Sequence, residues 1–142
     1  MQEFPIGMKN TTYVEVTPET TASRVRSGGV PTFSTPNLVA GMEVCCSTSL
    51  LPYLEEGQGS VGMSISVKHM ASTPVGMTVR FESELVEQDR RRLVFNIKAF
   101  DEFDQVGEAV HERFIIDNEK FLPKAAAKLE RFKALQKEKE NA

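Results

Sequence analysis

Between residues 27 and 54 the sequence holds one charged side chain, Glu43, although Asp, Glu, Lys and Arg make up 26% of the 142 residues. The "STP" motif at 34–36 predicts a helix start, because Thr35 can cap the helix with its hydroxyl and Pro36 suits its first position. We expect this helix to run to about residue 54. The face opposite the apolar arc that contains Glu43 also lacks charged residues, so the helix is expected to be enclosed on most sides.

After a turn at residues 55–60 the apolar pattern changes to a period of two, which is typical of strands. We predict strands over four segments joined by short turns, and we expect these to pair as an antiparallel meander. The four segments are 60–70, 77–88, 93–103 and 105–117. In the first of them, one face is expected to carry Val61, Met63, Ile65, Val67 and His69.

Three further segments complete the predicted order. Residues 11–17 alternate as a strand, and residues 19–32 are expected to form an irregular connection. An apolar stripe predicts a C-terminal helix over about 118–138, with a charged tail that frays. The stripe consists of Phe121, Ala125, Leu129 and Phe132.

Together these elements predict a single α+β domain over residues 1–142, in which an antiparallel sheet wraps around one long helix. An exposed sheet edge and the apolar content favour the pairing of two copies. The neighbouring cysteines at positions 45 and 46 are expected to be small buried residues rather than zinc ligands or a disulfide framework.

Composition excludes several classes of function. A net charge of -3 and a pI near 5.5 argue against a nucleic-acid partner, which requires a clustered basic excess. No apolar run approaches the roughly 20 residues that span a bilayer, so no membrane partner is expected. The N-terminus "MQEFPIGMKN" lacks the basic start and apolar segment of a secretory signal, which predicts a cytoplasmic location.

Glu43 and His69 are the candidate catalytic residues. A carboxylate among apolar neighbours should be a strong base once ionised, which suits a general base or a nucleophile. The structural alternatives for Glu43 are an ion pair with a distant Arg or Lys, or a solvent-facing position. His69 ends an apolar row and could instead be a hydrogen-bonded core histidine. For Gly62, close approach of a ligand and a bulge or tight helix contact remain equal alternatives.

The chain resembles the hotdog-fold acyl-CoA thioesterases, and is most similar to their fluoroacetyl-CoA thioesterase branch. Five motifs between about residues 33 and 117 carry the resemblance: "FST", "VAGMEVCC", "PYLEEGQGSVG", "VKHMASTPVGMTV" and "HER". It implies a hotdog fold, hydrolysis of a small acyl-CoA, a site between two subunits and therefore a homodimer or higher homo-oligomer. It also implies that Thr35, Glu43 and His69 are catalytic.

The resemblance and the residues also suggest how the substrate is bound. His111 and Arg113 alternate onto one strand face, where Arg113 could meet the phosphates of coenzyme A; a surface pair with Glu residues is the alternative. No metal and no cofactor other than the coenzyme A of the substrate is expected. The loop "SRVRSGGVP" has none of the aromatic residues that help close the pocket of the fluoroacetyl-specific enzyme, so selectivity for a fluorinated acyl group is not expected.

Two rival functions remain open from the sequence. The first is hydration or dehydration of an acyl thioester, since related folds use a histidine and a carboxylate to move protons. The second is a noncatalytic acyl-CoA-binding module in which Glu43 pairs with a partner charge.

Overall fold

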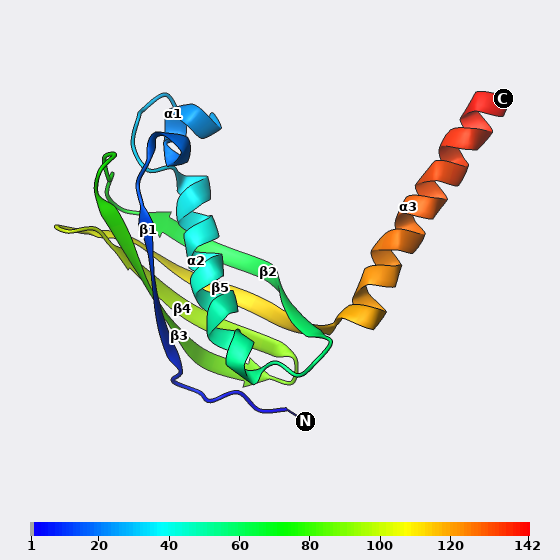
Figure 1. The fold of residues 1–142 in the computed structure, drawn as a ribbon, viewed down its shortest axis with the longest axis horizontal. Coiled ribbons are helices and arrows are strands. Elements are labelled where there is room, and N and C mark those ends of the chain that lie inside the picture. The colour runs from blue at the N-terminus through cyan, green and yellow to red at the C-terminus, as the bar shows by residue number, and fades with distance from the viewer. Residues whose placement is uncertain (1) are drawn as a thin grey trace.

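A five-stranded antiparallel sheet wraps around one long helix, α2 (Figure 1). The computed structural model describes residues 2–142. The α+β hotdog architecture expected above is therefore confirmed. The strands are β1 (Lys9–Glu15), β2 (Gln58–His69), β3 (Thr78–Asp89), β4 (Arg92–Phe100) and β5 (Gln105–Asp117), and the helices are α1 (Ala22–Val25), α2 (Thr35–Leu50) and α3 (Asn118–Asn141).

Helix α2 begins where the sequence predicts, but Thr35 does not cap it. The cap is Ser34, whose hydroxyl accepts a hydrogen bond from the backbone N–H of Asn37 at 3.2 Å. Thr35 and Pro36 are therefore the first two helical residues, and the Thr35 hydroxyl is free for another partner. The helix ends at Leu50 and continues as a short 3-10 turn, Leu51–Tyr53.

The inner face of α2 packs on the concave face of the sheet to form the core. Cys45 and Cys46 are fully buried and unbridged, as expected, and burial raises the pKa of the Cys46 thiol. Gly41 lets the Phe81 ring approach α2 where a side chain would clash. The other fully buried core residues include Leu38, Met42, Leu50, Leu85, Leu93 and Phe95.

The strand order is β1-β3-β4-β5-β2, so the predicted four-strand meander is wrong for β2. Only β3, β4 and β5 follow one another as hairpins, while β2 pairs with β5 at the opposite edge. The connection from β2 to β3 spans eight residues, 70–77, which is longer than the two to five residues of common hairpin loops. It crosses the end of the sheet, where the Thr73 hydroxyl donates to Asp101 at 2.9 Å.

A register shift between Gly62 and Ser64 divides β2 into two parts that face differently. Beyond the shift, Ile65 and Val67 pack against the core, as expected. At the shift itself, Met63 is 57% exposed, and just before it Gly62 lies against the Glu43 carboxylate. The predicted single apolar face of β2 is therefore wrong before the bulge, because an extra residue turns a strand by one face.

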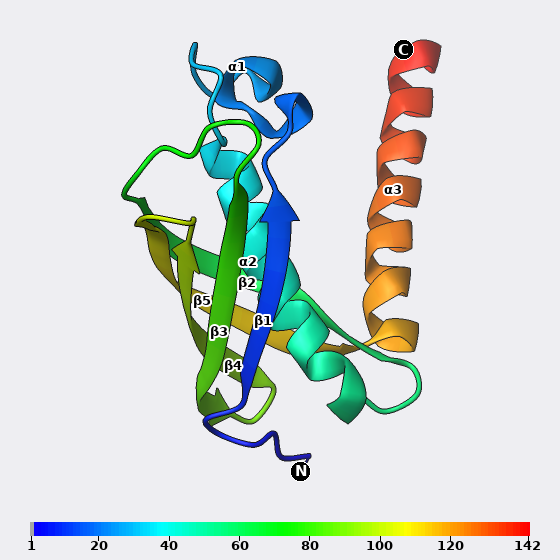
Figure 2. The same cartoon turned by 60° about the vertical axis from the view of Figure 1, so that its left-hand side comes forward.

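The segment before α2 is more regular than expected. It contains a 3-10 turn at Pro18–Thr20 and the short helix α1, both close to the N-terminal end of α2 (Figure 2). A short turn at Arg90 and Arg91 joins β3 to β4, as predicted for these two segments. Arg91 pairs with Asp117 at 3.2 Å, and Arg92 with Glu87 at 2.7 Å.

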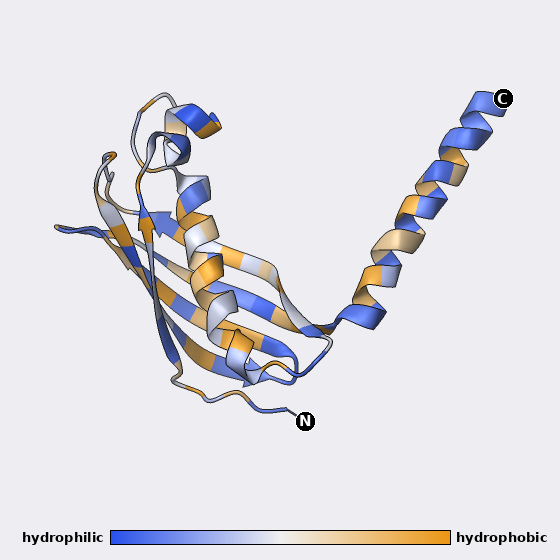
Figure 3. Cartoon of the chain, viewed as in Figure 1, coloured by the Kyte–Doolittle hydropathy of each residue, from blue (hydrophilic) through white to orange (hydrophobic). Residues whose placement is uncertain are grey.

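Helix α3 extends away from the sheet and from α2 (Figures 1 and 2). It continues to Asn141, beyond the predicted end near residue 138, and has no buried residue. Figure 3 shows apolar positions along its length. Within residues 2–142, no helix combines the length and apolar character required to cross a bilayer.

Candidate active site

Thr35 and His69 form a hydrogen-bonded pair at the N-terminal end of α2. The Thr35 Oγ1 atom lies 2.8 Å from Nδ1 of His69, because β2 ends beside the first turn of α2. A shallow pocket of about 320 Å³ opens over the two residues and is also lined by Phe33, Met70 and Ser72. The pair therefore meets solvent-accessible space where a ligand can enter.

His69 is neutral at physiological pH. Burial lowers its pKa from the ordinary value of 6.5, against a smaller opposing effect of the Ala71 backbone. Its Nε2 atom is buried and has no hydrogen-bond partner within residues 2–142. A buried polar atom without a partner is costly, and a ligand or a second chain reaches this nitrogen only if the ring or its neighbours shift.

Glu43 lies on α2 about two turns after Thr35 and belongs to a second group of residues. Its Oε2 accepts one hydrogen bond from Nη1 of Arg113, at 3.5 Å. A Cβ on Gly62 would lie 2.7 Å from the same oxygen, so the glycine makes room for the carboxylate. The Glu43 side chain is 43% exposed in the single chain, so the expected enclosure is not provided by one copy.

Arg113 is held rigidly behind Glu43. It is 6% exposed, and its Nε donates to the Ser60 hydroxyl at 3.0 Å while Nη2 donates to the Ser60 carbonyl at 3.1 Å. Burial lowers the pKa of Arg113, and Glu43 opposes that effect. A guanidinium remains charged even so, and it faces the carboxylate as a fixed cation.

His111 supports Arg113 from the side. Its Nδ1 lies 2.7 Å from the Ser64 carbonyl and its Nε2 lies 3.2 Å from Nη1 of Arg113. The tautomer that satisfies both contacts is neutral: Nδ1–H donates to the carbonyl and Nε2 accepts from the guanidinium. Consistent with this, burial lowers the pKa of His111.

The predicted site residues thus fall into two groups. One is Thr35 with His69, and the other is Glu43 with Gly62, His111 and Arg113. Among residues 2–142 no hydrogen bond joins the two groups, so His69 partners Thr35 and not Glu43 within one chain. Gly62 lies at the bulge of β2 and in tight contact with Glu43 of α2. Both forms of the structural alternative for Gly62, a bulge and a tight helix contact, are therefore present.

Sequence reasoning missed the supporting serines. Ser60 anchors Arg113 and Ser64 orients His111, whereas Ser34 caps α2 and so releases Thr35. The roles of Ser60 and Ser64 depend on the pairing of β2 with β5, which the sequence order does not reveal. The role of Ser34 is local to the start of α2.

The comparisons with known proteins agree on one family. The sequence model of a family described as "Fluoroacetyl-CoA-specific thioesterase" matches residues 16–119. A fluoroacetyl-CoA thioesterase from Streptantibioticus cattleyicolor is 43% identical over 96 residues, which cover 68% of this chain and 69% of that protein. The chain belongs to the fluoroacetyl-CoA-specific thioesterase family.

Solved structures of thioesterases show the same fold. A variant of the fluoroacetyl-CoA-specific thioesterase superimposes with a TM-score of 0.84 at 34% identity, covering 90% of this chain and 99% of the other. A thioesterase superfamily member from Thermus thermophilus gives a TM-score of 0.88 at 29% identity, covering 94% and 99%. This member of the fluoroacetyl-CoA-specific thioesterase family is therefore an acyl-CoA thioesterase.

Proposed function

We propose that this thioesterase hydrolyses a small acyl-CoA in a site built from two copies of the chain. One copy supplies Thr35 and His69, and the other supplies Glu43 against Gly62. The observation that carries the proposal is the Glu43 carboxylate that one chain leaves 43% exposed, together with a Thr35–His69 pair whose pocket contains no carboxylate from residues 2–142 of its own chain. The Thr35–His69 pair lacks a carboxylate, and the Glu43 carboxylate lacks a hydrogen bond to a hydroxyl or a histidine within the described residues.

In the proposed reaction Glu43 is the general base or the nucleophile. As base, it removes a proton from water while the water oxygen attacks the thioester carbonyl carbon. The C–S bond then breaks, and the electron pair leaves on the sulfur of coenzyme A. As nucleophile, the carboxylate forms an anhydride that water hydrolyses in a second step.

His69 supplies the complementary proton. With Nδ1 accepting a hydrogen bond from the Thr35 hydroxyl, the neutral ring carries its proton on Nε2. A shift of the ring that exposes this buried atom lets it donate to the developing oxyanion or to the leaving thiolate. Thr35 then orients the ring and fixes its tautomer. A lowered His69 pKa keeps this neutral form at physiological pH.

The free edge of the sheet gives the two copies a way to meet. Strand β2 is an edge strand, bonded only to β5 among the described strands. Two β2 strands paired antiparallel about a two-fold axis near Ile65 and Ser66 place His69 of one copy opposite the partner's Gly62. Such a homodimer brings the two groups together twice, once at each end of the paired strands.

We assign His111 and Arg113 to positioning Glu43 rather than to the phosphates of coenzyme A. The guanidinium is buried and already bonded to Ser60, His111 and Glu43. A phosphate contact would require these bonds to break. The pair therefore acts through the carboxylate.

A second catalytic scheme starts from the same pair at the helix end. The distance of 2.8 Å between Thr35 and His69 is also the geometry of a hydroxyl nucleophile with its base. In that scheme the Thr35 oxygen attacks the thioester carbonyl while His69 takes its proton, and the C–S bond breaks to release coenzyme A and leave an acyl-threonine. Glu43 then activates the water that hydrolyses the acyl-threonine. The two schemes differ in how completely the loss of the Thr35 hydroxyl removes activity.

The substrate is proposed as a small acyl-CoA without selectivity for fluorine. Residues 19–32, which precede the Thr35 pocket, contain no aromatic side chain, and the next residue, Phe33, is 2% exposed and belongs to the core. A location in the cytoplasm stays a prediction from the N-terminal sequence.

A thiol-release assay over acetyl-, fluoroacetyl- and butyryl-CoA tests the proposal. We expect turnover by the natural chain and, for Glu43→Gln, a kcat lower by about a hundredfold or more with unchanged circular dichroism. Glu56→Gln, in an exposed turn, is the matched control and should retain activity. Near-normal turnover by Glu43→Gln would remove Glu43 from the mechanism. With crotonyl-CoA as a further substrate, loss of the enoyl absorbance while the thioester stays intact would indicate hydration instead.

A further inference from the structure

Helix α3 carries an apolar stripe that its own chain leaves uncovered. The stripe consists of half-exposed side chains, whose exposed fractions range from 42% to 61%. At 100° of rotation per residue, the five side chains fall on one broad face of the helix, which includes the predicted positions Phe121 and Phe132. The stripe is Phe121, Leu122, Leu129, Phe132 and Leu135.

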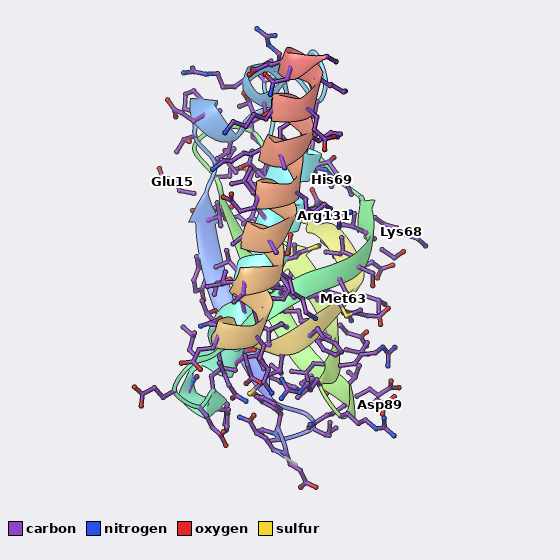
Figure 4. The ribbon with its side chains drawn as sticks, turned by 90° about the vertical axis from the view of Figure 1, so that its right-hand side faces the viewer. Glu15, Met63, Lys68, His69, Asp89 and Arg131 are labelled. Atoms are coloured by element: carbon purple, nitrogen blue, oxygen red, sulfur yellow. The ribbon has the colours of Figure 1, made fainter. Side chains whose placement is uncertain are left out.

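Helix α3 lies on a side of the molecule from which α2 is also visible. From that side, in Figure 4, α2 is seen behind α3 and between the two sheet edges, β1 and β2. In Figure 1 the two helices stand well apart. Glu43 is the only charged residue of α2. Next to it on the exposed side of the helix, Val44 is 51% exposed.

Charge distinguishes α3 from the rest of the chain. Residues 118–142 hold seven Lys and Arg against four Glu, whereas residues 1–117 hold ten basic and sixteen acidic residues. Lys120, Lys124, Lys128 and Arg131 form a basic row beside the stripe, three or four residues apart. The helix is therefore a basic arm on an acidic body, and its natural complement is another acidic body of the same kind.

The available area also fits a second copy. Half-exposed side chains of this size offer roughly 70–100 Å² each, so one arm contributes about 400 Å². A standard interface requires about 800 Å² from each partner, so the arm supplies about half of it. The uncharged face of α2 and the free edge of β2 can supply the rest, and all three surfaces adjoin the same space.

We infer that α3 is a dimer arm, which lays its apolar stripe against the acidic body of a second copy while that copy lays its own arm on the first. This inference rests on the proposed two-copy active site and adds the element that stabilises it. An anionic membrane surface is the rival partner for a basic amphipathic helix. The acidic surplus of residues 1–117 would be repelled by such a surface, which favours the second copy.

The test compares two double variants of the full chain by sedimentation equilibrium, with circular dichroism to confirm their helix content. Leu129→Ser with Phe132→Ser removes the centre of the stripe. Ala127→Ser with Glu130→Ser places the same two serines on the opposite, exposed face. We expect the stripe variant to raise the Kd of the dimer by about 100-fold or more and the control to leave it within about threefold.

The two inferences fail in different ways. If the natural chain is a dimer and the stripe variant dimerises equally tightly, the arm is wrong and the two-copy site stands. If the natural chain is a monomer that turns over substrate, both are wrong, and a monomer without turnover also overturns the arm. Flotation of the natural chain with phosphatidylglycerol vesicles, lost in the stripe variant while the dimer persists, would assign the stripe to a membrane and overturn the inference.

Discussion

The Thr35 hydroxyl lies 2.8 Å from Nδ1 of His69, although the two residues are 34 positions apart in the chain. The contact exists because Ser34 caps α2 in place of Thr35. The threonine is thus released from an ordinary structural role at a helix end and paired with the one titratable ring in the adjoining pocket.

Replacement of Thr35 separates the two catalytic schemes. If the hydroxyl orients His69, Thr35→Ala removes one hydrogen bond of about 1–1.5 kcal/mol and lowers kcat roughly tenfold. Thr35→Ser should restore most of the rate, because it keeps the hydroxyl. A loss above about a thousandfold in Thr35→Ala, with a burst of thiol in the natural chain, would instead identify Thr35 as the nucleophile.

Gly62 tests whether the position of Glu43 matters for catalysis. Gly62→Ala places a methyl group 2.7 Å from the Oε2 position, which forces the carboxylate to move. We expect kcat/KM to fall by about 10- to 100-fold, since a shift near 1 Å costs about that much. Gly59→Ala, on the same strand but beside Asn118, is the control, and equal activities for the two variants would contradict the prediction.

The two histidines give the fold a defined dependence on pH. Burial lowers the pKa of both His69 and His111 below 6.5, so the unfolded chain binds protons that the folded chain resists. The free energy of unfolding should therefore be highest above about pH 7 and fall as the pH falls through 6.5. Urea unfolding at pH 7.5, 6.5 and 5.5 measures this.

His111→Gln is the companion variant for the pH series. It should weaken the loss of stability between pH 7.5 and 5.5, because one of the two buried titrating rings is gone. A urea midpoint that is independent of pH over this range in the natural chain would show that the rings are not held neutral.

The sequence allowed the element types and the overall layering to be predicted from local patterns. The otherwise uncharged segment around Glu43 predicted a helix that other parts of the protein enclose, and the segments with a period of two predicted strands. The order of the strands was not predictable, since β2 and β3 are consecutive in the chain but lie on either side of β4 and β5. Nothing local to residues 70–77 distinguishes a wide crossing from a hairpin.

The candidate site residues come from the sequence and stay a prediction, whereas their contacts could not be predicted from it. The bulge at Gly62 reverses the facing of the first part of β2, and this brings Arg113 and Ser60 behind Glu43. An ion pair with a distant arginine was one of the alternatives for Glu43, and the structure contains it. Its identity depends on the β2–β5 register, which is a tertiary property.

Subunit complementation tests the two-copy site most directly. Thr35→Ala and Glu43→Gln are each purified, mixed in equal amounts under conditions that exchange subunits, and assayed for thiol release. Random pairing makes half of the dimers mixed, and each mixed dimer holds one intact site of two, so activity should recover to roughly a quarter of the natural level. Activity that stays at the average of the two separate variants would show that each site lies within one chain.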